Sequence, residues 1–319
     1  MILVTGGTGF IGSHLVEALA ARGEAVRVLL RRSSPKPHPA ADCSYGDLTT
    51  GAGLEGALDG VDSVIHLAGV TRAIRSADYY AGNTRATELL LRAMGRRALR
   101  FVHVSSLAAA GPCAGDVPVT EEDAPRPLTP YGKSKWEAEK LVRERAPQAV
   151  IIRPPVVYGG RDTGVLQVLK PISQGIAPRI AGGERRLSMI YVKDLVAGLL
   201  AAEISPVAAG RTYFLAHPRP VTWSELGAAA ASIMGRDPIV LRVPLPLARA
   251  IGFGAEIWGR IRRRPSIVSR DKIAEAACSA WVCDSRRAAG ELGFEAQTSL
   301  DAGLRETLAW YKEAGWLRY

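Results

Sequence analysis

Short apolar runs alternate with longer amphipathic segments through the first half of the chain, and this alternation limits the fold more than any other feature. Strands are predicted over residues 2–5, 25–30, 63–67, 101–104 and 150–152, with another before Gly46, and helices over 11–22, 77–94 and 131–145. Strands that alternate with helices form crossover units, which build a parallel sheet covered on both faces. The sequence therefore predicts an α/β fold with a doubly wound parallel sheet of the Rossmann type.

After residue 153 the pattern loosens, because proline and glycine become more frequent. A strand leading into a helix is predicted over 190–202, a short strand over 213–215 and a helix over 223–234, with Thr222 as its cap. We place a boundary near residue 155. Residues 1–155 would form the Rossmann domain, and residues 156–319 a smaller α/β substrate-binding region, partly woven back onto the first.

Composition and charge narrow the class of protein. The chain has 319 residues, of which 47% are hydrophobic and 23% charged, as in ordinary globular enzymes. The net charge of +10 comes from arginines spread along the chain without a basic tail, so no nucleic-acid partner is expected. Cysteines at 43, 113, 278 and 283 have no zinc spacing, so no metal is expected. With no secretory signal and no long apolar stretch, a cytoplasmic location is expected.

A glycine-rich loop joins the first predicted strand to the first helix. It reads Thr5-Gly6-Gly7-Thr8-Gly9-Phe10-Ile11-Gly12. Gly6 would permit a tight turn, Gly9 would let a pyrophosphate approach the backbone, and Gly12 would let the helix pack closely on the strand. Free N–H groups at the helix N-terminus favour phosphate. We interpret residues 6 and 8–12 as part of a dinucleotide site.

The end of the second strand bears on the choice of dinucleotide. An NAD site usually has an acidic residue there, whereas arginine accommodates the 2′-phosphate of NADP. Here Arg31 and Arg32 follow the strand, so NADP is expected and NAD is the alternative. Both arginines would otherwise be solvated surface residues. Asp47, followed by Leu48, is placed to meet the adenine, although an aspartate after a glycine is also a common turn residue.

Tyr131 and Lys135 begin a predicted helix four residues apart and therefore share one face. A nearby ammonium lowers the pKa of a tyrosine, which would make Tyr131 a general acid or base. Ser105 and Ser106 end a predicted parallel strand, the edge at which active sites of such sheets form. Ser106 would hydrogen-bond the substrate oxygen that Tyr131 protonates, and Ser105 would support the site.

These motifs together resemble the extended short-chain dehydrogenase/reductase superfamily, strongly over residues 1–160 and more loosely afterwards. The matching stretches are TGGTGFIG at 5–12, GDL at 46–48, HLAG at 66–69, Asn83, the serine pair, YGKSK at 131–135, RPPVVYG at 153–159 and the segment 190–195. The resemblance implies that Ser106, Tyr131 and Lys135 are catalytic and that Lys135 also holds the nicotinamide ribose. It further implies cofactor contacts at Leu67, Ala68, Gly69, Asn83, Pro154 and Val156, and a homodimer. His66 is expected to be structural.

Three local features distinguish the classes of enzyme within this superfamily. Sugar-nucleotide enzymes commonly carry an asparagine after the conserved arginine, where this chain has proline and valine at 154–157. Dehydratases carry an Asp-Glu pair beside the catalytic serine, where this chain has Leu-Ala-Ala-Ala at 107–110. The stretch VSSLAAAGP at 104–112 is similar to 3β-hydroxysteroid dehydrogenases, and the chain resembles their branch, with the dihydroflavonol reductases, most closely.

The resulting hypothesis is an NADP(H)-dependent oxidoreductase that interconverts a ketone and a secondary alcohol on a lipophilic, sterol-like or otherwise apolar, substrate. A nucleotide-sugar epimerase and a non-catalytic dinucleotide-binding protein are the alternatives. In the second half, residues 245–264 combine an apolar helical stripe with an arginine cluster. This segment would be a lid or core helix, or would contact a membrane surface.

Overall fold

A seven-stranded parallel sheet forms the centre of the molecule. The computed structural model describes residues 1–35, 37–262, 266 and 269–319. The sheet strands are β1 (Ile2–Thr5), β2 (Val26–Leu30), β3 (Asp42–Tyr45), β4 (Ser63–His66), β5 (Arg100–Val104), β6 (Val150–Arg153) and β11 (Thr212–Phe214). Their order across the sheet is β11-β6-β5-β4-β1-β2-β3. Every pairing is parallel, so the predicted doubly wound Rossmann sheet is confirmed.

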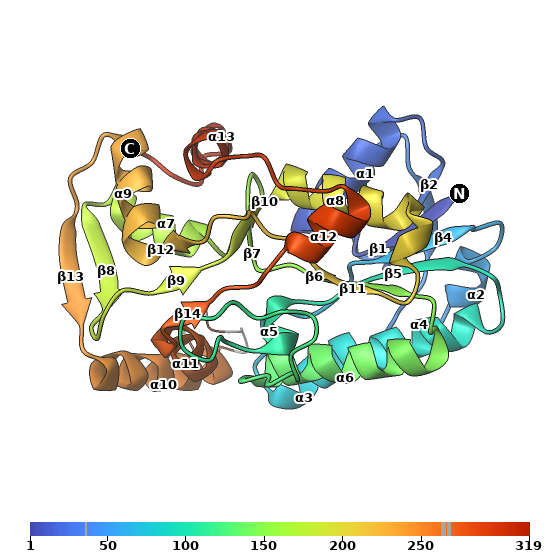
Figure 1. The fold of residues 1–319 in the computed structure, drawn as a ribbon, viewed down its shortest axis with the longest axis horizontal. Helices are drawn as coiled ribbons and strands as arrows, with labels where there is room; N and C mark the ends of the chain where they lie inside the picture. The colour runs from blue at the N-terminus through green and yellow to red at the C-terminus, as the bar shows by residue number, and fades with distance from the viewer. Residues whose placement is uncertain (36, 263–265, 267–268) are drawn as a thin grey trace.

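Helices cover both faces of this sheet (Figure 1). On one face lie α1 (Phe10–Ala21), α8 (Val192–Ile204) and α12 (Arg286–Leu292), and on the other α2 (Leu54–Ala57), α4 (Ala86–Met94) and α6 (Pro130–Arg145). Each face has its own apolar core, because the strands are buried on both sides. The edge strand β11 begins at residue 212, so a segment from the second half of the chain completes the main sheet.

The segment predicted as one helix over 77–94 has three parts. Helix α3 (Ser76–Tyr79) passes through a π-helical stretch, η1 (Tyr80–Arg85), into α4. A π-helix has a wider turn than an α-helix and often occurs at functional sites. Asn83 lies in this stretch and is buried. Two short helical pieces, α5 (Leu107–Ala110) and η2 (Pro206–Ala208), lie in connections between strands of the main sheet.

The second region contains short strands and further helices. The strand pairs are β7 (Val156–Tyr158) with β10 (Met189–Tyr191), and β8 (Ile176–Ile180) with β13 (Ile239–Val243). A third sheet has β9 (Arg186–Leu187) between β12 (Val221–Thr222) and β14 (Ala280–Trp281). The helices are α7 (Leu166–Ser173), α9 (Trp223–Met234), α10 (Leu245–Ile261), α11 (Arg270–Ala277) and α13 (Leu300–Glu313). As predicted, the hydroxyl of Thr222 caps α9, accepting a hydrogen bond from the backbone N–H of Glu225.

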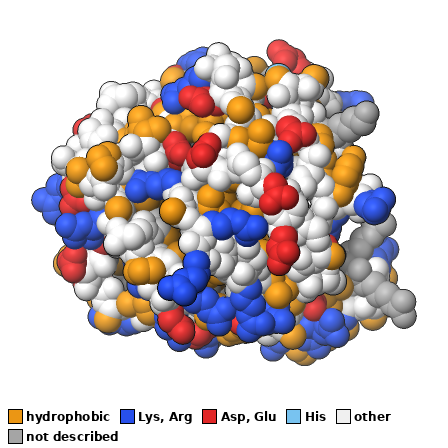
Figure 2. Space-filling view, turned by 90° about the vertical axis from the view of Figure 1, so that its right-hand side faces the viewer, with side chains coloured by type: hydrophobic (Ala, Val, Ile, Leu, Met, Phe, Trp, Pro, Cys, Tyr) orange, Lys and Arg blue, Asp and Glu red, His pale blue; other side chains and the backbone are white. Residues whose placement is uncertain are grey.

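Charged side chains are mixed over the end of the molecule that Figure 2 faces, the right-hand end of Figure 1. Apolar side chains occur there as scattered spots among charged and polar ones. Some arginines of the main sheet and of the helices that flank it are paired: Arg92 and Arg145 contact Glu88, and Arg27 contacts Asp42.

Candidate active site

The glycine loop follows β1 and leads into α1 at the C-terminal edge of the sheet. Gly6 has a φ of +73°, and a Cβ atom there would lie 2.7 Å from the backbone nitrogen of Ala68. A Cβ atom on Gly12 would lie 2.1 Å from the carbonyl oxygen of Gly6. Gly9 precedes the first turn of α1, and its N–H donates to Gly6 at 2.9 Å. Only glycine fits at positions 6 and 12, because the backbone segments there are nearly in contact.

The first turn of α1 is open to a ligand. Among the described residues, no side chain caps this turn and no acidic residue lies in it. Thr8 and Gly9 are exposed, and Phe10 and Ile11 are half-buried. Backbone N–H groups that lack a cap, at the positive end of a helix dipole, suit a phosphate group. The loop and helix therefore fit the pyrophosphate of a dinucleotide.

Arg31 and Arg32 lie at the end of β2 and are both exposed. The nearby Asp47 accepts hydrogen bonds at 2.7 Å from both the N–H and the hydroxyl of Thr49. The bond from the Thr49 hydroxyl is the main influence that lowers the pKa of Asp47. Asp47 thus forms the local turn that was its alternative interpretation, and Leu48 packs beside it against the core of the sheet.

The segment after β4 runs beside the glycine loop. Leu67 and Ala68 are half-buried and Gly69 is exposed. Asn83 holds the end of this segment, because its side chain accepts from the N–H of Val70 at 2.7 Å and donates to the Val70 carbonyl at 3.0 Å. It also donates to the hydroxyl of Ser134 at 2.8 Å. Asn83 therefore connects the β4 edge to helix α6.

His66 is the last residue of β4, and its side chain is buried. Its ring nitrogens contact the hydroxyls of Thr5 at 2.6 Å and Thr87 at 3.0 Å. Burial, and then the charge of Lys135, lowers the pKa of His66 to about 3. The ring is therefore neutral and held between two hydroxyl groups, as a structural histidine would be.

Tyr131 and Ser106 meet at the C-terminal end of β5. Ser106 precedes α5, where its hydroxyl accepts from the N–H of Ala108 at 3.1 Å. Burial raises the pKa of Tyr131 to about 12, although the neighbouring Ser106 side chain lowers it. The sequence-based expectation that Lys135 lowers this pKa is wrong here. Lys135 is not among the described groups that shift it.

Lys135 points back into the sheet. Its Nζ donates to the carbonyl oxygen of Val104 at 2.7 Å, and only 5% of the residue is exposed. Burial lowers the pKa of Lys135 to about 8. The Nζ atom lies 3.7 Å from where a Cβ atom of Gly69 would be, so it reaches the edge of the sheet after β4. Lys135 therefore stands between the strand end that carries the serines and the segment beside the glycine loop.

Ser105 belongs to a buried ionic cluster that sequence analysis missed. Its hydroxyl donates to Glu139 at 2.6 Å, and the guanidinium of Arg153 donates to both Glu139 oxygens at 2.9 and 2.7 Å. Burial is the largest influence and opposes ionisation of Glu139, but the hydrogen bonds and charge of Arg153, with Ser105 and Arg143, together outweigh it, so its pKa is lowered. The cluster fixes helix α6 to β5 and β6. A glutamate four residues after Lys135, on the same helical face, was the available signal.

Pro154 and Val156 follow β6 at the same edge. The buried Pro154 accepts a hydrogen bond at its carbonyl from the N–H of Leu107 at 2.9 Å, next to Ser106. Val156 is exposed and begins β7. The glycine loop, the segment after β4, Ser106 and residues 154–156 thus all follow the C-terminal ends of the central strands β1, β4, β5 and β6.

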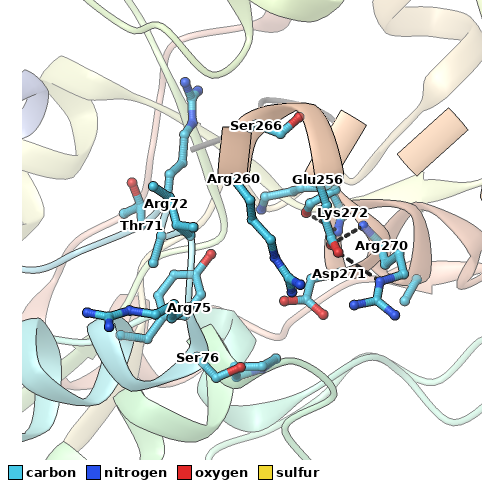
Figure 3. Close-up of a pocket in the computed structure, with 17 residues that line it drawn as sticks. Thr71, Arg72, Arg75, Ser76, Glu256, Arg260, Ser266, Arg270, Asp271 and Lys272 are labelled. Atoms are coloured by element: carbon cyan, nitrogen blue, oxygen red, sulfur yellow. Dashed lines mark hydrogen bonds and ion pairs between the residues drawn. The ribbon is translucent and has the colours of Figure 1, made fainter. Parts of the chain in front are cut away.

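A cavity of about 490 Å³ reaches Pro130, the residue before Tyr131. Pro130 and Tyr79 line it, and the Tyr79 ring lies 6.0 Å from the ring of Tyr131, centre to centre. Figure 3 shows Arg260 reaching from α10 into this space toward Asp271 of α11. The charged lining residues that the structure describes are Arg72, Arg75, Glu256, Arg260, Arg270, Asp271 and Lys272. The apolar substrate expected from the sequence does not predict so polar a cavity.

The fold and this site define an NAD(P)-dependent enzyme. The model of the NAD dependent epimerase/dehydratase family matches residues 2–215. The chain belongs to this family, within the extended short-chain dehydrogenase/reductase superfamily, as its motifs predicted.

Three curated relatives span nearly the whole chain. A ceramide reductase of Caulobacter vibrioides is 31% identical, covering 99% of this chain and 96% of the relative. An N-acetyl-alpha-D-glucosaminyl-diphospho-ditrans,octacis-undecaprenol 4-epimerase of Escherichia coli O157:H7 is 29% identical, covering 96% and 94%. A 3 beta-hydroxysteroid dehydrogenase/Delta 5-->4-isomerase of Mycobacterium tuberculosis is 28% identical, covering 97% and 90%. The relatives therefore include both oxidoreductases and an epimerase.

Solved structures share the fold over the whole chain. The crystal structure of gox2253 has a TM-score of 0.83 at 25% identity, covering 100% of this chain and 99% of the other. MoeE5 in complex with UDP-glucose and NAD has a TM-score of 0.79 at 24% identity, covering 98% and 99%. The glycine-only contacts at Gly6 and Gly12 fit the dinucleotide that this family binds.

Proposed function

We propose that this enzyme reduces a ketone on a long-chain or polycyclic lipid, using NADPH, and oxidises the alcohol in reverse. The observation that carries the proposal is that the Ser106 and Tyr131 side chains are neighbours, next to Tyr79 and Pro130, which line the cavity. Two hydroxyl groups next to a space for substrate can together hold one carbonyl oxygen. When bound, the dinucleotide would supply the hydride, and the chain's own residues would handle the proton.

Tyr131 would act as the acid in reduction. Its hydroxyl keeps its proton at neutral pH, because burial raises its pKa to about 12. It can therefore donate to a carbonyl oxygen that becomes more basic during reduction. Ser106 would hold the same oxygen, since its other contact is an accepted bond from Ala108 that leaves the hydroxyl hydrogen available.

Lys135 would position the cofactor and supply positive charge. One of its three ammonium hydrogens is bonded to Val104, which leaves two for a ribose hydroxyl near Gly69. With a pKa of about 8, it is mostly charged at neutral pH. Its charge would favour negative charge developing nearby in the transition state.

NADP is the proposed cofactor because Arg31 and Arg32 are exposed where β2 ends, the position at which an arginine accommodates a 2′-phosphate in such folds. Replacing both arginines with serine should weaken NADPH binding by at least about ten-fold and leave NADH binding nearly unchanged. Fluorescence titration with both cofactors measures this. Equal affinities in the wild type would remove the argument for NADP.

The substrate class rests on the relatives and the cavity together. The named substrates of the relatives above, a ceramide, a steroid and a polyprenyl diphospho-sugar, are lipids or lipid-linked. The charged cavity suits the polar end of such a molecule better than a wholly apolar one. Arg75, Arg270 and Lys272 have carboxylate partners, and Arg72 donates to the carbonyl of Thr163 at 3.2 Å.

The test is NADPH oxidation with a panel of keto-ceramides, ketosteroids and prenylated ketones, using UDP-sugars as controls. Tyr131→Phe should lower kcat by about 10²–10⁴-fold with cofactor affinity nearly unchanged. Tyr80→Phe, an exposed tyrosine on the neighbouring π-helical stretch, is the matched control and should keep full activity. Full activity of Tyr131→Phe, or turnover of no ketone in the panel, would refute the proposal.

Epimerisation of a lipid-linked sugar is the second candidate. The Escherichia coli relative and the arginines of the cavity favour it, because guanidinium groups bind diphosphates. The absence of an asparagine at 154–157 argues against a sugar nucleotide. An epimerase keeps oxidised cofactor through purification and needs none added. Release of NAD⁺ on denaturing the purified protein, with epimerisation of a polyprenyl diphospho-sugar, would decide for this candidate.

A further inference from the structure

Helix α10 turns an apolar stripe toward solvent. Its apolar residues Leu247, Ile251, Ile257, Trp258 and Ile261 are all exposed, Ile261 by 68%. The helix packs through small residues instead: Ala248 and Gly252 are its buried positions, and Gly252 lies against Ser269 and Ile273. A surface helix of a globular protein normally has the opposite arrangement, with its apolar stripe toward the core.

Arginines border this stripe on both sides. At 100° per residue, Leu247, Ile251 and Trp258 lie on one row, and Ile257 and Ile261 lie beside it. Arg249 lies beyond one margin of the stripe and Arg262 at the other, whereas Arg260 turns away into the cavity. The Arg262 guanidinium lies 4.5 Å from the centre of the Trp258 ring. The acidic residue of the helix, Glu256, is paired with Arg270 at 2.8 Å.

Strand β13 extends the apolar surface. Ile239, Val240 and Leu241 are exposed, Ile239 by 77%, and the strand leads directly into α10 through Pro244. In Figure 1, β13 and α10 lie at the end of the molecule opposite α2 and β2. That opposite end, facing the viewer in Figure 2, has only scattered apolar side chains. We call the exposed residues of 239–241 and 247–262 the α10–β13 surface.

We propose that the α10–β13 surface docks on a lipid bilayer that contains anionic lipids. A helix with an apolar face, a tryptophan and flanking arginines lies in the plane of the interface, with its aliphatic side chains among the acyl chains. The exposed Arg249 and Arg262 would meet lipid phosphates at the rim. Two copies packed through this surface would instead bring like-charged margins together, which disfavours a second copy as the occupant. No described helix is long and apolar enough to span a membrane.

Docking would place the substrate cavity at the membrane. Glu256, Gly259 and Arg260 of the same helix line the cavity beside Tyr131. A keto-lipid could then pass from the bilayer to the site along α10. This last step rests on the proposed function, whereas the docking itself does not.

Vesicle co-sedimentation tests the docking. The full-length wild type should pellet with vesicles of phosphatidylglycerol and phosphatidylcholine at low salt, and much less with pure phosphatidylcholine or in high salt. Ile251→Glu combined with Trp258→Glu should weaken partitioning by at least about ten-fold, because two carboxylates would enter the apolar interface. Ile204→Glu with Val207→Glu, which also replaces two exposed apolar residues but near the C-terminus of α8, is the matched control and should bind like wild type.

Three outcomes would overturn the proposal: no pelleting of the wild type with anionic vesicles, equal pelleting of the α10 variant, or equal loss in the control. Light scattering measures the oligomeric state and so tests whether a second copy of the chain occupies this surface instead. A wild-type dimer that ignores vesicles and becomes a monomer in the α10 variant would make this surface a protein interface. Sedimentation needs no turnover, so a protein that binds vesicles but oxidises no NADPH would refute only the proposed function.

Discussion

Gly12 lies where helix α1 crosses the backbone of Gly6. A Cβ atom there would meet a carbonyl oxygen at 2.1 Å, and backbone cannot move aside as a flexible side chain can. Gly12→Ala should therefore displace the loop, weaken cofactor binding by at least about ten-fold and destabilise the fold by about 1–3 kcal/mol. Cofactor titration and thermal unfolding measure both effects.

Gly290 provides the matched control for this substitution. It lies in helix α12, where an added Cβ atom has open space. Gly290→Ala should leave cofactor affinity unchanged and stabilise the protein by up to about 1 kcal/mol, because alanine is the better helix former. If Gly12→Ala behaved in the same way, the close approach in the loop would not matter for binding.

Lys135 gives the site a pH dependence. Its pKa is lowered to about 8, so the ammonium loses its proton as the pH rises through that value, while Tyr131 stays protonated. For reduction, kcat/KM of the cofactor should fall above about pH 8, since this ratio reports groups of the free enzyme.

Lys135→Arg tests the origin of that fall. A guanidinium keeps its charge throughout the accessible pH range, so the activity that this variant retains should lack the decline near pH 8. Arg143→Lys, on the same helix but partly exposed, should keep the wild-type profile. A decline of equal size and position in Lys135→Arg would assign the ionisation to another group.

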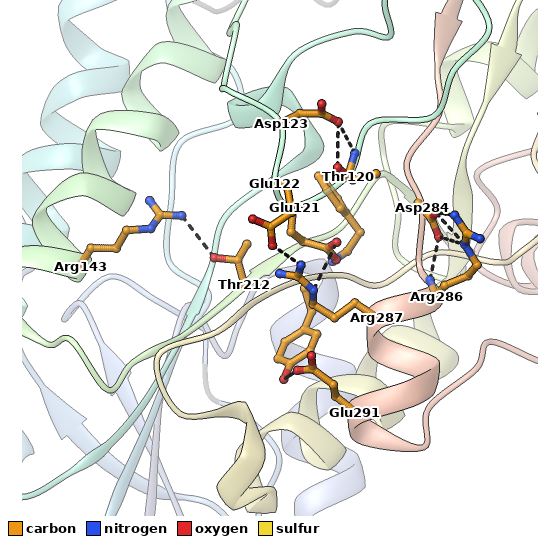
Figure 4. A network of polar contacts seen from close by, with 12 residues as sticks. Thr120, Glu121, Glu122, Asp123, Arg143, Thr212, Asp284, Arg286, Arg287 and Glu291 are labelled. Carbon is orange, nitrogen blue, oxygen red and sulfur yellow. Dashed lines mark hydrogen bonds and ion pairs between the residues drawn. The ribbon is translucent and has the colours of Figure 1, made fainter.

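At the scale of elements, a polar network fastens the segment before α6 to β11 and α12 (Figure 4). Glu121 accepts a hydrogen bond from the N–H of Phe214 at 2.9 Å, and Arg287 of α12 contacts both Glu121 and Glu122. Thr120 and Asp123 form a turn beside them. Burial raises the pKa of Glu121, which means that its ionised form costs free energy in the folded state.

Two substitutions at Glu121 should affect thermal stability differently. Glu121→Gln keeps an acceptor for Phe214 and removes the buried charge, so the midpoint of thermal unfolding at pH 7 should stay or rise slightly. Glu121→Ala leaves that N–H without its acceptor and should cost about 1–3 kcal/mol. As the folded pKa is raised, any gain from Glu121→Gln should shrink as the pH falls toward that pKa. Calorimetry at pH 5 and 7 checks this, and equal losses in both variants would contradict it.

The central strands of the main sheet were predictable from sequence because each is a short apolar run buried on both faces, such as 2–5 and 63–66, whereas the edge strand β3 is polar and mostly exposed. The short strands of the second region, such as β9 and β14, were not, because two-residue pairings depend on partners far along the chain. The π-helical stretch around Asn83 was not predicted either, since the spacing of apolar residues does not distinguish its wider turn from that of an α-helix.

Similar limits applied to the site. Local sequence pattern predicts the glycine loop, and parallel topology predicts which residues follow the strand ends. Together they place Gly6, Ser106 and Tyr131 at the C-terminal edge of the sheet. Spacing four apart put Lys135 on the face of Tyr131 but did not fix its rotamer, and its Nζ bonds to Val104 instead. Spacing also places Glu139 on the face of Lys135, but it does not show that Arg153, from a separate strand, pairs with Glu139 in the core.

On the scale of the whole molecule, the first sheet depends on residues far beyond its sixth strand. Strand β11 pairs with β6, and Leu195 and Leu199 of α8 are fully buried in the core on one face. A fragment of residues 1–155 should therefore fail to fold, whereas residues 1–215 retain all seven strands and should show more native secondary structure. Circular dichroism and denaturant unfolding compare the two. A cooperative transition in the shorter fragment would contradict this dependence.

This arrangement also has a consequence during translation. After β6 has left the ribosome, its outer edge, with the buried Ile151 and Ile152, lacks the neighbour that residues 212–214 later provide. Synthesis of the intervening roughly 60 residues takes about 3–12 s at typical elongation rates. An unpaired apolar strand edge is a site of aggregation. The nascent chain therefore has a period of several seconds in which chaperone binding at β6 would protect it, and slow codons between residues 154 and 211 would lengthen that period.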